Sequence, residues 1–174
     1  MAIAKAYGWS VYENRGNGIG DNITTALSHV TSQFFISIEH DILLSREWWE
    51  KVSKYMKYQD VAVAQGVRVA TDPLLRKLDE YVIENTHGDA LYSLDNNIYR
   101  TKIIRNLGMN LWPNETGARK KIEESGMKWI VDKNVVSDHI RPGIQPFIKH
   151  IYTMRPLIKR ERLRMLRIFI TSPF

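Results

Sequence analysis

The order of apolar and polar positions predicts a chain of alternating helices and strands. Apolar residues recur at helical spacing from Asp21 to His29, and an unbroken apolar run follows at Phe34–Ile38. The same criteria place the other helices at Ala2–Tyr7, Ser45–Tyr58, Leu74–Glu84, Ile98–Leu107 and Thr116–Ser125. They place the other strands at Trp9–Glu13, Val61–Ala64, Lys128–Asp132 and Val135–Asp138. This order predicts an α/β domain with three layers and a mainly parallel sheet.

Residues that favour helix ends and turns support several of these boundaries. Ser45 is expected to cap one helix, and Asp72 followed by Pro73 to open the next. Gly126 is expected to end the helix before it. A turn at Lys133-Asn134 is expected to separate the last two strands.

The charge is distributed unevenly along the 174 residues. Seven of the 25 Lys and Arg residues, but only one of the 19 acidic residues, lie from Lys149 onward. The preceding part is therefore neutral, which argues against a nucleic-acid-binding domain. There is no cysteine, which excludes disulfides and thiolate metal sites, and no apolar run approaches the roughly 20 residues of a membrane span. We expect a domain over residues 1–143 and a separate tail over residues 144–174.

The basic tail has two interpretations. Its apolar residues fall at helical spacing, with Arg and Lys between them: Met154, Leu157, Ile158, Met165, Ile168 and Phe169. A basic amphipathic helix of this kind can lie on an anionic membrane surface. Alternatively, it packs on the domain and its arginines reach past apolar surface to water.

Two carboxylates follow the apolar run at Phe34–Ile38. Glu39 and Asp41 are two positions apart, so in an extended backbone their side chains point the same way and can converge on one cation. Oxygen ligands suit Mg²⁺ or Mn²⁺, which also bridge to phosphate oxygens. The alternative is a solvated strand end whose acids favour the start of the next helix.

Three further positions carry weaker signals, each with a structural alternative. His139 follows a predicted strand, where it can be a metal ligand or an ordinary polar residue. Glu115 lies at a helix start, where an acid also complements the helix dipole. Asn17-Gly18 can bring backbone amides to a phosphate, or simply connect two elements. P-loop, nucleophile-elbow and HExxH motifs are absent from the sequence.

Taken in order, these signals resemble the GT-A fold glycosyltransferases of family 2, which use nucleotide-diphospho-sugar donors. Tyr7–Val52 is similar to the family's segment that runs into its acidic DxD motif. Asp95–Met109 (DNNIYRTKIIRNLGM) is similar to its acceptor-side segment. Asn114–Arg141 resembles its later block, in which an acidic pair opens a helix and a His follows a strand. The resemblance covers roughly residues 5–141 and implies a GT-A-like α/β/α fold.

The resemblance also implies roles for individual residues. Glu39 and Asp41 take the DxD positions, which hold a divalent cation (Mn²⁺ or Mg²⁺) and the donor diphosphate, and His139 completes the metal site. Glu115 takes the position of the general base that deprotonates the acceptor hydroxyl for an inverting attack. The acceptor-side residues are Asn97, Tyr99 and Arg100.

Three departures from the family pattern bear on activity. DxD has become Glu39-His40-Asp41, and the family's Glu-Asp pair has become Asn114-Glu115. The nucleoside-binding strands that open the family's domain have no counterpart in this sequence, which suggests a fragment or a truncated relative. From the resemblance we expect an enzyme that moves a sugar to a glycan or lipid-linked acceptor. We expect it in the cytoplasm, peripherally at the inner membrane face. The alternative is a non-catalytic interaction module.

Overall fold

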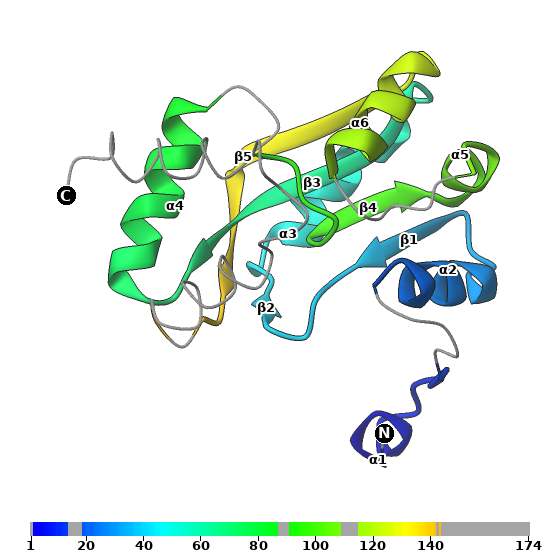
Figure 1. Cartoon of the computed structure of the whole chain (residues 1–174), viewed down its shortest axis with the longest axis horizontal. Coiled ribbons are helices and arrows are strands. Elements are labelled where there is room, and N and C mark those ends of the chain that lie inside the picture. The colour runs from blue at the N-terminus through cyan, green and yellow to red at the C-terminus, as the bar shows by residue number, and fades with distance from the viewer. Residues whose placement is uncertain (1, 14–18, 87–90, 109–114, 142, 144–174) are drawn as a thin grey trace.

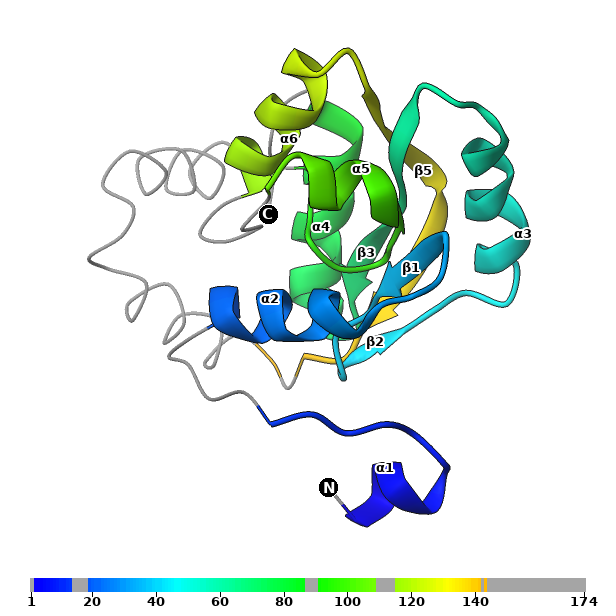
Figure 2. The ribbon, with the colours of Figure 1, turned by 90° about the vertical axis from the view of Figure 1, so that its right-hand side faces the viewer.

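The computed structural model describes residues 2–13, 19–86, 91–108, 115–141 and 143. A central sheet is covered by α3 and the 3-10 helix η1 on one face and by α2, α4, α5 and α6 on the other (Figures 1 and 2). The helices are α1 (Ala2–Ala6), α2 (Ile19–His29), α3 (Trp48–Ser53), η1 (Lys54–Lys57), α4 (Pro73–Asn85), α5 (Thr101–Asn106) and α6 (Glu115–Glu124). The strands are β1 (Phe34–Ser37), β2 (Ile42–Leu43), β3 (Val61–Ala70), β4 (Asn97–Arg100) and β5 (Lys128–His139).

The strands form one mixed sheet in the order β1-β4-β3-β5-β2. β3 and β5 run parallel, whereas the pairs β1–β4, β3–β4 and β2–β5 are antiparallel. The α/β class is therefore confirmed, but the expectation of a mainly parallel sheet is wrong. The apolar run at Phe34–Ile38 indicated burial on both faces. β1 is instead an edge strand: Phe34 and Phe35 are half-buried and Ile36 is exposed, so the apolar pattern reports neither complete burial nor strand direction.

Neighbouring residues of the central strands contribute to two separate cores, one on each face of the sheet. Val63 and Tyr99 pack with residues of α5 and α6, whereas Ala64 and Ile98 pack with residues of α3. All four side chains are buried. Because successive side chains of a strand point to opposite faces, strands covered on both sides are apolar throughout. Their burial is the main hydrophobic contribution to folding, at about 25 cal/mol per Å².

Two of the predicted helix boundaries are confirmed and one is wrong. Asp72 caps α4, because its carboxylate accepts hydrogen bonds from the backbone N–H groups of Leu74 and Leu75 (3.1 and 3.0 Å). Gly126 follows α6 with a φ of +77°, which is the left-handed conformation that ends many helices. Ser45 is not a cap: α3 begins at Trp48, and its cap position makes no side-chain hydrogen bond.

β3 and β4 differ from the sequence prediction. β3 continues through Gln65 and Gly66 to Ala70, whereas the predicted strand ends at Ala64. A Cβ atom at Gly66 would lie 2.6 Å from the carbonyl oxygen of Val135, so glycine is required by the close approach of β5. The start of the predicted helix Ile98–Leu107 belongs to β4, because pairing with β1 and β3 outweighs the local helical pattern.

β5 is one strand instead of two. Its register with β3 passes from the pair Gly66–Asp132 directly to Val67–Val136, so residues 133–135 form a bulge where a turn was predicted. The predicted strand Trp9–Glu13 is absent, because these residues pair with no strand of the described sheet. The two-residue β2 was not predicted.

The tail over residues 144–174, with its predicted amphipathic helix, lies outside the described residues, so the proposed division of the chain stays a prediction. Among the helices that are described, none has the length and apolar character needed to cross a membrane.

Candidate functional site

Two acids and a histidine converge at one end of the sheet. Glu39 and Asp41 follow β1, and His139 is the last residue of β5. One ligand atom from each lies within 4.8 Å of the other two, and His139 Nε2 is 3.2 Å from Asp41 Oδ2. Glu39 is exposed, Asp41 is half-buried and His139 is buried. The structure thus brings together the three residues that the sequence analysis assigned to a metal site.

The pairing of β2 with β5 produces this convergence. Ile42 is opposite His139 in the antiparallel register, and the backbone N–H of Ile140 donates to the carbonyl of Asp41 (2.8 Å). On its other side, β5 is held by β3, where the backbone N–H of Thr71 donates to the carbonyl of His139 (2.9 Å). Backbone hydrogen bonds from both neighbours therefore fix the position of the imidazole relative to the acids.

A second layer of charge surrounds the acids. Arg68 of β3 contacts the carboxylate of Asp95 through Nη1, and the same nitrogen lies 3.8 Å from Glu39 Oε2. Asp95 is only 2% exposed. Arg141 Nε donates to His139 Nε2 at 3.4 Å. None of these three residues was individually assigned a role from the sequence. The available signal for Arg68 was a single charged residue in the mostly apolar segment Val61–Ala70.

The turn that carries Asp95 is itself held from inside the sheet. Asn96 has a φ of +62°, in the left-handed region that non-glycine residues rarely occupy. It is completely buried, its Nδ2 donates to the carbonyl of Val67 (3.1 Å), and its Oδ1 accepts from the hydroxyl of Ser137 (3.3 Å). These bonds hold the unusual conformation and fix the position of the adjacent Asp95.

Burial and neighbouring charges shift the pKa values of the site. Although the Glu39 side chain is 56% exposed, partial loss of hydration raises its pKa, the negative charge of Asp95 raises it further, and Arg68 opposes the shift. The pKa of His139 is lowered by burial and then by the positive charges of Arg141 and Arg68. Burial would raise the pKa of Asp41, but its interactions with His139 and its own backbone outweigh burial and lower it. His139 is therefore neutral near pH 7, which is the form that binds a metal ion.

The donor set fits a small divalent cation. Asp41 Oδ1 is buried and has no hydrogen-bond partner among the described residues, while Oδ2 of the same carboxylate contacts His139. Ligand atoms bound at about 2.1 Å to one octahedral ion lie about 3 Å apart, which matches the separation of Asp41 and His139. The two carboxylates are ligands suited to Mn²⁺ and Mg²⁺, and the imidazole favours the transition metal of the two, Mn²⁺.

The predicted acceptor-side residues lie inside the fold. Asn97 and Tyr99 are fully buried and hydrogen-bonded to each other (2.7 Å). Arg100 is 7% exposed and donates to three carbonyls, those of Met56, Tyr58 and Val61. All three side chains stabilise β4 from within the fold, and their role toward an acceptor stays a prediction.

The remaining predicted residues are only partly placed. Glu115 is the first residue of α6, and its side chain lies outside the described part. Asn17 and Gly18 lie outside it altogether. The roles assigned to these residues stay predictions from the resemblance.

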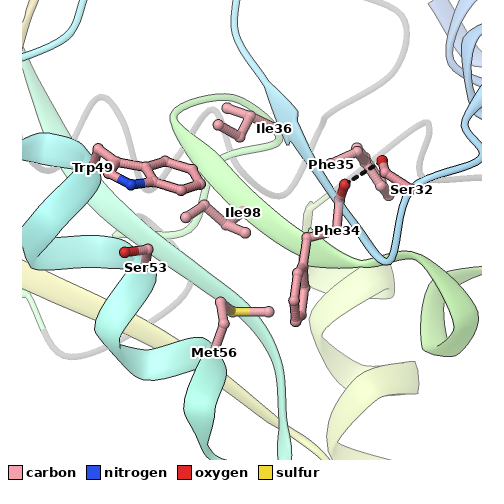
Figure 3. Close-up of a pocket in the computed structure, with 8 residues that line it drawn as sticks. All are labelled: Ser32, Phe34, Phe35, Ile36, Trp49, Ser53, Met56 and Ile98. Carbon is pink, nitrogen blue, oxygen red and sulfur yellow. Dashed lines mark hydrogen bonds between the residues drawn. The ribbon is translucent and has the colours of Figure 1, made fainter.

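An apolar cavity of about 460 Å³ lies apart from the charged cluster, between β1 and α3. Figure 3 shows Trp49, Ser53 and Met56 lying opposite Phe34 and Ile36 of the edge strand. Its lining is Ser32, Phe34, Phe35, Ile36, Trp49, Ser53, Met56 and Ile98. None of the three candidate metal ligands lines it, so the cavity is not part of the site described above.

Comparison with known proteins identifies the family. The model of glycosyl transferase family 2 matches residues 1–124, which include Glu39, Asp41 and Glu115 but end before His139. A search of curated proteins finds no match. Because the matched region covers more than two thirds of the sequence and contains the acidic pair at the end of β1, the chain belongs to glycosyl transferase family 2.

Proposed function

We propose that the chain is a metal-dependent glycosyltransferase that moves a sugar from a nucleotide-diphospho-sugar to an acceptor hydroxyl with inversion. Membership of family 2 supports glycosyltransferase-type function and, in general, binding of a nucleotide-sugar donor and an acceptor. The observation that carries the metal dependence is the convergence of Glu39, Asp41 and His139, with ligand atoms within 4.8 Å of one another.

The three proposed metal ligands differ in their exposure to solvent. His139 is fixed in the fold and offers a neutral nitrogen, while Asp41 offers Oδ2, which lies 3.2 Å from that nitrogen. Glu39 is exposed and closes the ligand set from the solvent side. When bound, Mn²⁺ or Mg²⁺ supplies positive charge that stabilises the diphosphate as it leaves the sugar.

Glu115 is the proposed general base. Its carboxylate would take the proton of the acceptor hydroxyl while that oxygen attacks the anomeric carbon from the side opposite the diphosphate. The oxygen–carbon bond forms as the bond to the diphosphate breaks, which inverts the configuration. The family match includes this residue, and its position as the first residue of α6 supports the assignment.

The acceptor and the location are also proposals. A glycan or lipid-linked acceptor would suit a chain whose last 26 residues carry seven Lys and Arg residues and one acid. Such a segment favours contact with anionic lipid, where each Lys or Arg contributes about 1 kcal/mol. This would place the enzyme peripherally at the cytoplasmic membrane face.

The test is a transfer assay with a panel of uridine and guanosine diphosphate-sugars and lipid-linked or glycan acceptors, with and without Mn²⁺. We expect Mn²⁺-dependent release of nucleoside diphosphate, lowered at least about 100-fold by Asp41→Asn. Asp60→Asn is the matched control, because Asp60 is an exposed acid that pairs with Lys128. Absence of both Mn²⁺ binding and transfer would favour the non-catalytic alternative.

A further inference from the structure

Arg68 is held beside the candidate cation site by an acid that solvent does not reach. Its Nη1 contacts the carboxylate of Asp95, which is 2% exposed, and lies 3.8 Å from Glu39. A charged pair of this kind needs good geometry to compensate for its desolvation. The left-handed turn at Asn96, fixed through Val67 and Ser137, provides that geometry.

The guanidinium retains donors for a ligand. Among the described residues, Arg68 makes its bonds through Nη1, and its side chain is 28% exposed. Nε and Nη2 make no bond to the described residues and are therefore available to a ligand. A guanidinium presents its donors in a planar fork that matches the oxygens of a phosphate.

The charge of the cluster favours an anion once a cation is bound. Glu39, Asp41 and Asp95 carry one more charge than Arg68 and Arg141 together. Binding a divalent cation reverses the sign of this sum, and the two guanidinium groups then lie next to a cation. An anion that contacts both the cation and Arg68 is attracted electrostatically by both.

We propose that Arg68 binds phosphate oxygens of the donor diphosphate beside the ion site, and that Asp95 is the positioning residue that holds Arg68 there. This inference rests on the proposed function, because it assigns a residue to the same ligand. It accounts for a buried acid and a strained turn behind the candidate metal ligands.

The experiment compares two affinities in each variant of the full chain. One is for Mn²⁺ alone, and the other is for inorganic pyrophosphate at a fixed Mn²⁺ concentration, which avoids any dependence on the nucleoside. We expect Arg68→Gln to weaken pyrophosphate binding at least about tenfold, since hydrogen bonds to charged groups are strong. Binding of Mn²⁺ alone should be unchanged or tighter, because a neighbouring positive charge has been removed.

The control and the conservative variants separate ligand contact from general support of the fold. Arg119→Gln removes the same charge from α6, where Arg119 pairs with Glu123, and should leave pyrophosphate binding within about twofold. Arg68→Lys should retain part of the affinity, because the charge remains and the fork is lost. Asp95→Asn should weaken pyrophosphate binding while Arg68 is still present.

Two results would overturn the proposal. One is pyrophosphate binding within twofold of the wild type in Arg68→Gln. The other is a parallel loss of Mn²⁺ and pyrophosphate binding, which indicates structural support alone. If Arg68→Gln does not fold, the proposal is tested with Arg68→Lys and Asp95→Asn. Unchanged pyrophosphate binding in both of these variants contradicts it. Failure of the proposed function gives a different result, in which the wild type binds no Mn²⁺. In that case, pyrophosphate binding that depends on Arg68 in the absence of metal still supports the role of Arg68.

Discussion

Asp41 and His139 are 98 positions apart in the sequence, yet Oδ2 of one lies 3.2 Å from Nε2 of the other. The contact depends on two residues, Ile42 and Leu43, which pair with the end of β5 and bring the preceding Asp41 beside the imidazole. The site is therefore assembled by a short antiparallel pairing at one edge of the sheet. Substitutions that interrupt this pairing should therefore weaken metal binding more than they lower the stability of the fold.

His139 is the most informative residue for testing metal binding, because it lies beyond the matched family region. We expect His139→Gln to weaken Mn²⁺ binding at least about tenfold, since the variant loses a buried nitrogen ligand. Titration followed by electron paramagnetic resonance of free Mn²⁺ measures the affinity directly. His40→Gln is the matched control, because His40 is exposed and is not one of the three converging residues. Equal affinities in the two variants would exclude His139 as a ligand.

The second prediction concerns Glu115 at the start of α6. Glu115→Gln should lower the rate of sugar transfer by about 100-fold or more and leave donor binding intact, because the amide cannot accept the acceptor proton. Single-turnover kinetics with saturating donor measure the rate. Glu124→Gln, at the other end of the same helix, should transfer at the wild-type rate. Unchanged turnover in Glu115→Gln would leave Glu115 only its structural role at the helix start.

The sequence predicted the helices better than the sheet. α4 has both a cap and a proline at its start, which are local signals that tertiary contacts did not alter. The stretch at Ile98 was assigned to a helix, but it pairs with strands on both sides in the structure. Pairing partners are distant in sequence, so local periodicity contains no information about strand direction, the bulge in β5 or the two residues of β2.

The candidate site was predictable only in part, for the same reason. Glu39 and Asp41 were expected to converge because an extended backbone points alternate side chains the same way. The segment is instead a turn, closed by the backbone N–H of Ile42 donating to the carbonyl of Glu39 (3.3 Å), so the convergence was predicted but its geometry was not. Arg68 and Asp95 come together only through the packing of β3 against the turn before β4, and nothing local in either segment indicates the other. The left-handed Asn96 that places Asp95 lies between the predicted helices Leu74–Glu84 and Ile98–Leu107, where no helix or strand was predicted.

The third prediction is a pH-dependent contribution of Asp132 to stability. Burial would raise the pKa of Asp132, but hydrogen bonds from the hydroxyl of Tyr55 (2.8 Å) and the backbone N–H of Asn134 (3.1 Å) lower it below its usual value. A depressed pKa stabilises the fold above the unfolded-state value of about 3.9, and this stabilisation is lost as the pH falls through the folded-state pKa. Asp132→Asn should therefore be less stable than the wild type at pH 7, with a difference that shrinks below about pH 4.

Urea unfolding at pH 7 and pH 3 measures this difference. Asp60→Asn is the comparison, because Asp60 is exposed and pairs with Lys128 at the surface. Its effect should disappear at high salt, whereas that of the partly enclosed Asp132 should persist. A stability difference for Asp132→Asn that is constant across pH would mean that the carboxylate charge contributes nothing.

The last prediction tests the close approach of β3 and β5. A Cβ atom at Gly66 would lie 2.6 Å from the carbonyl oxygen of Val135, which belongs to the bulge. Gly66→Ala should therefore destabilise the fold by about 1–3 kcal/mol, because the backbone of β5 has to move. The pairs that follow the bulge end at Ala70 and His139, so the same displacement should also weaken Mn²⁺ binding.

Gly126→Ala provides the contrast: its φ of +77° adds about 1 kcal/mol of strain, but no atom lies within 4 Å of the new Cβ. It should lower the midpoint of urea unfolding and leave the Mn²⁺ affinity unchanged. If both variants bind Mn²⁺ equally well, the geometry of the metal site does not depend on the bulge.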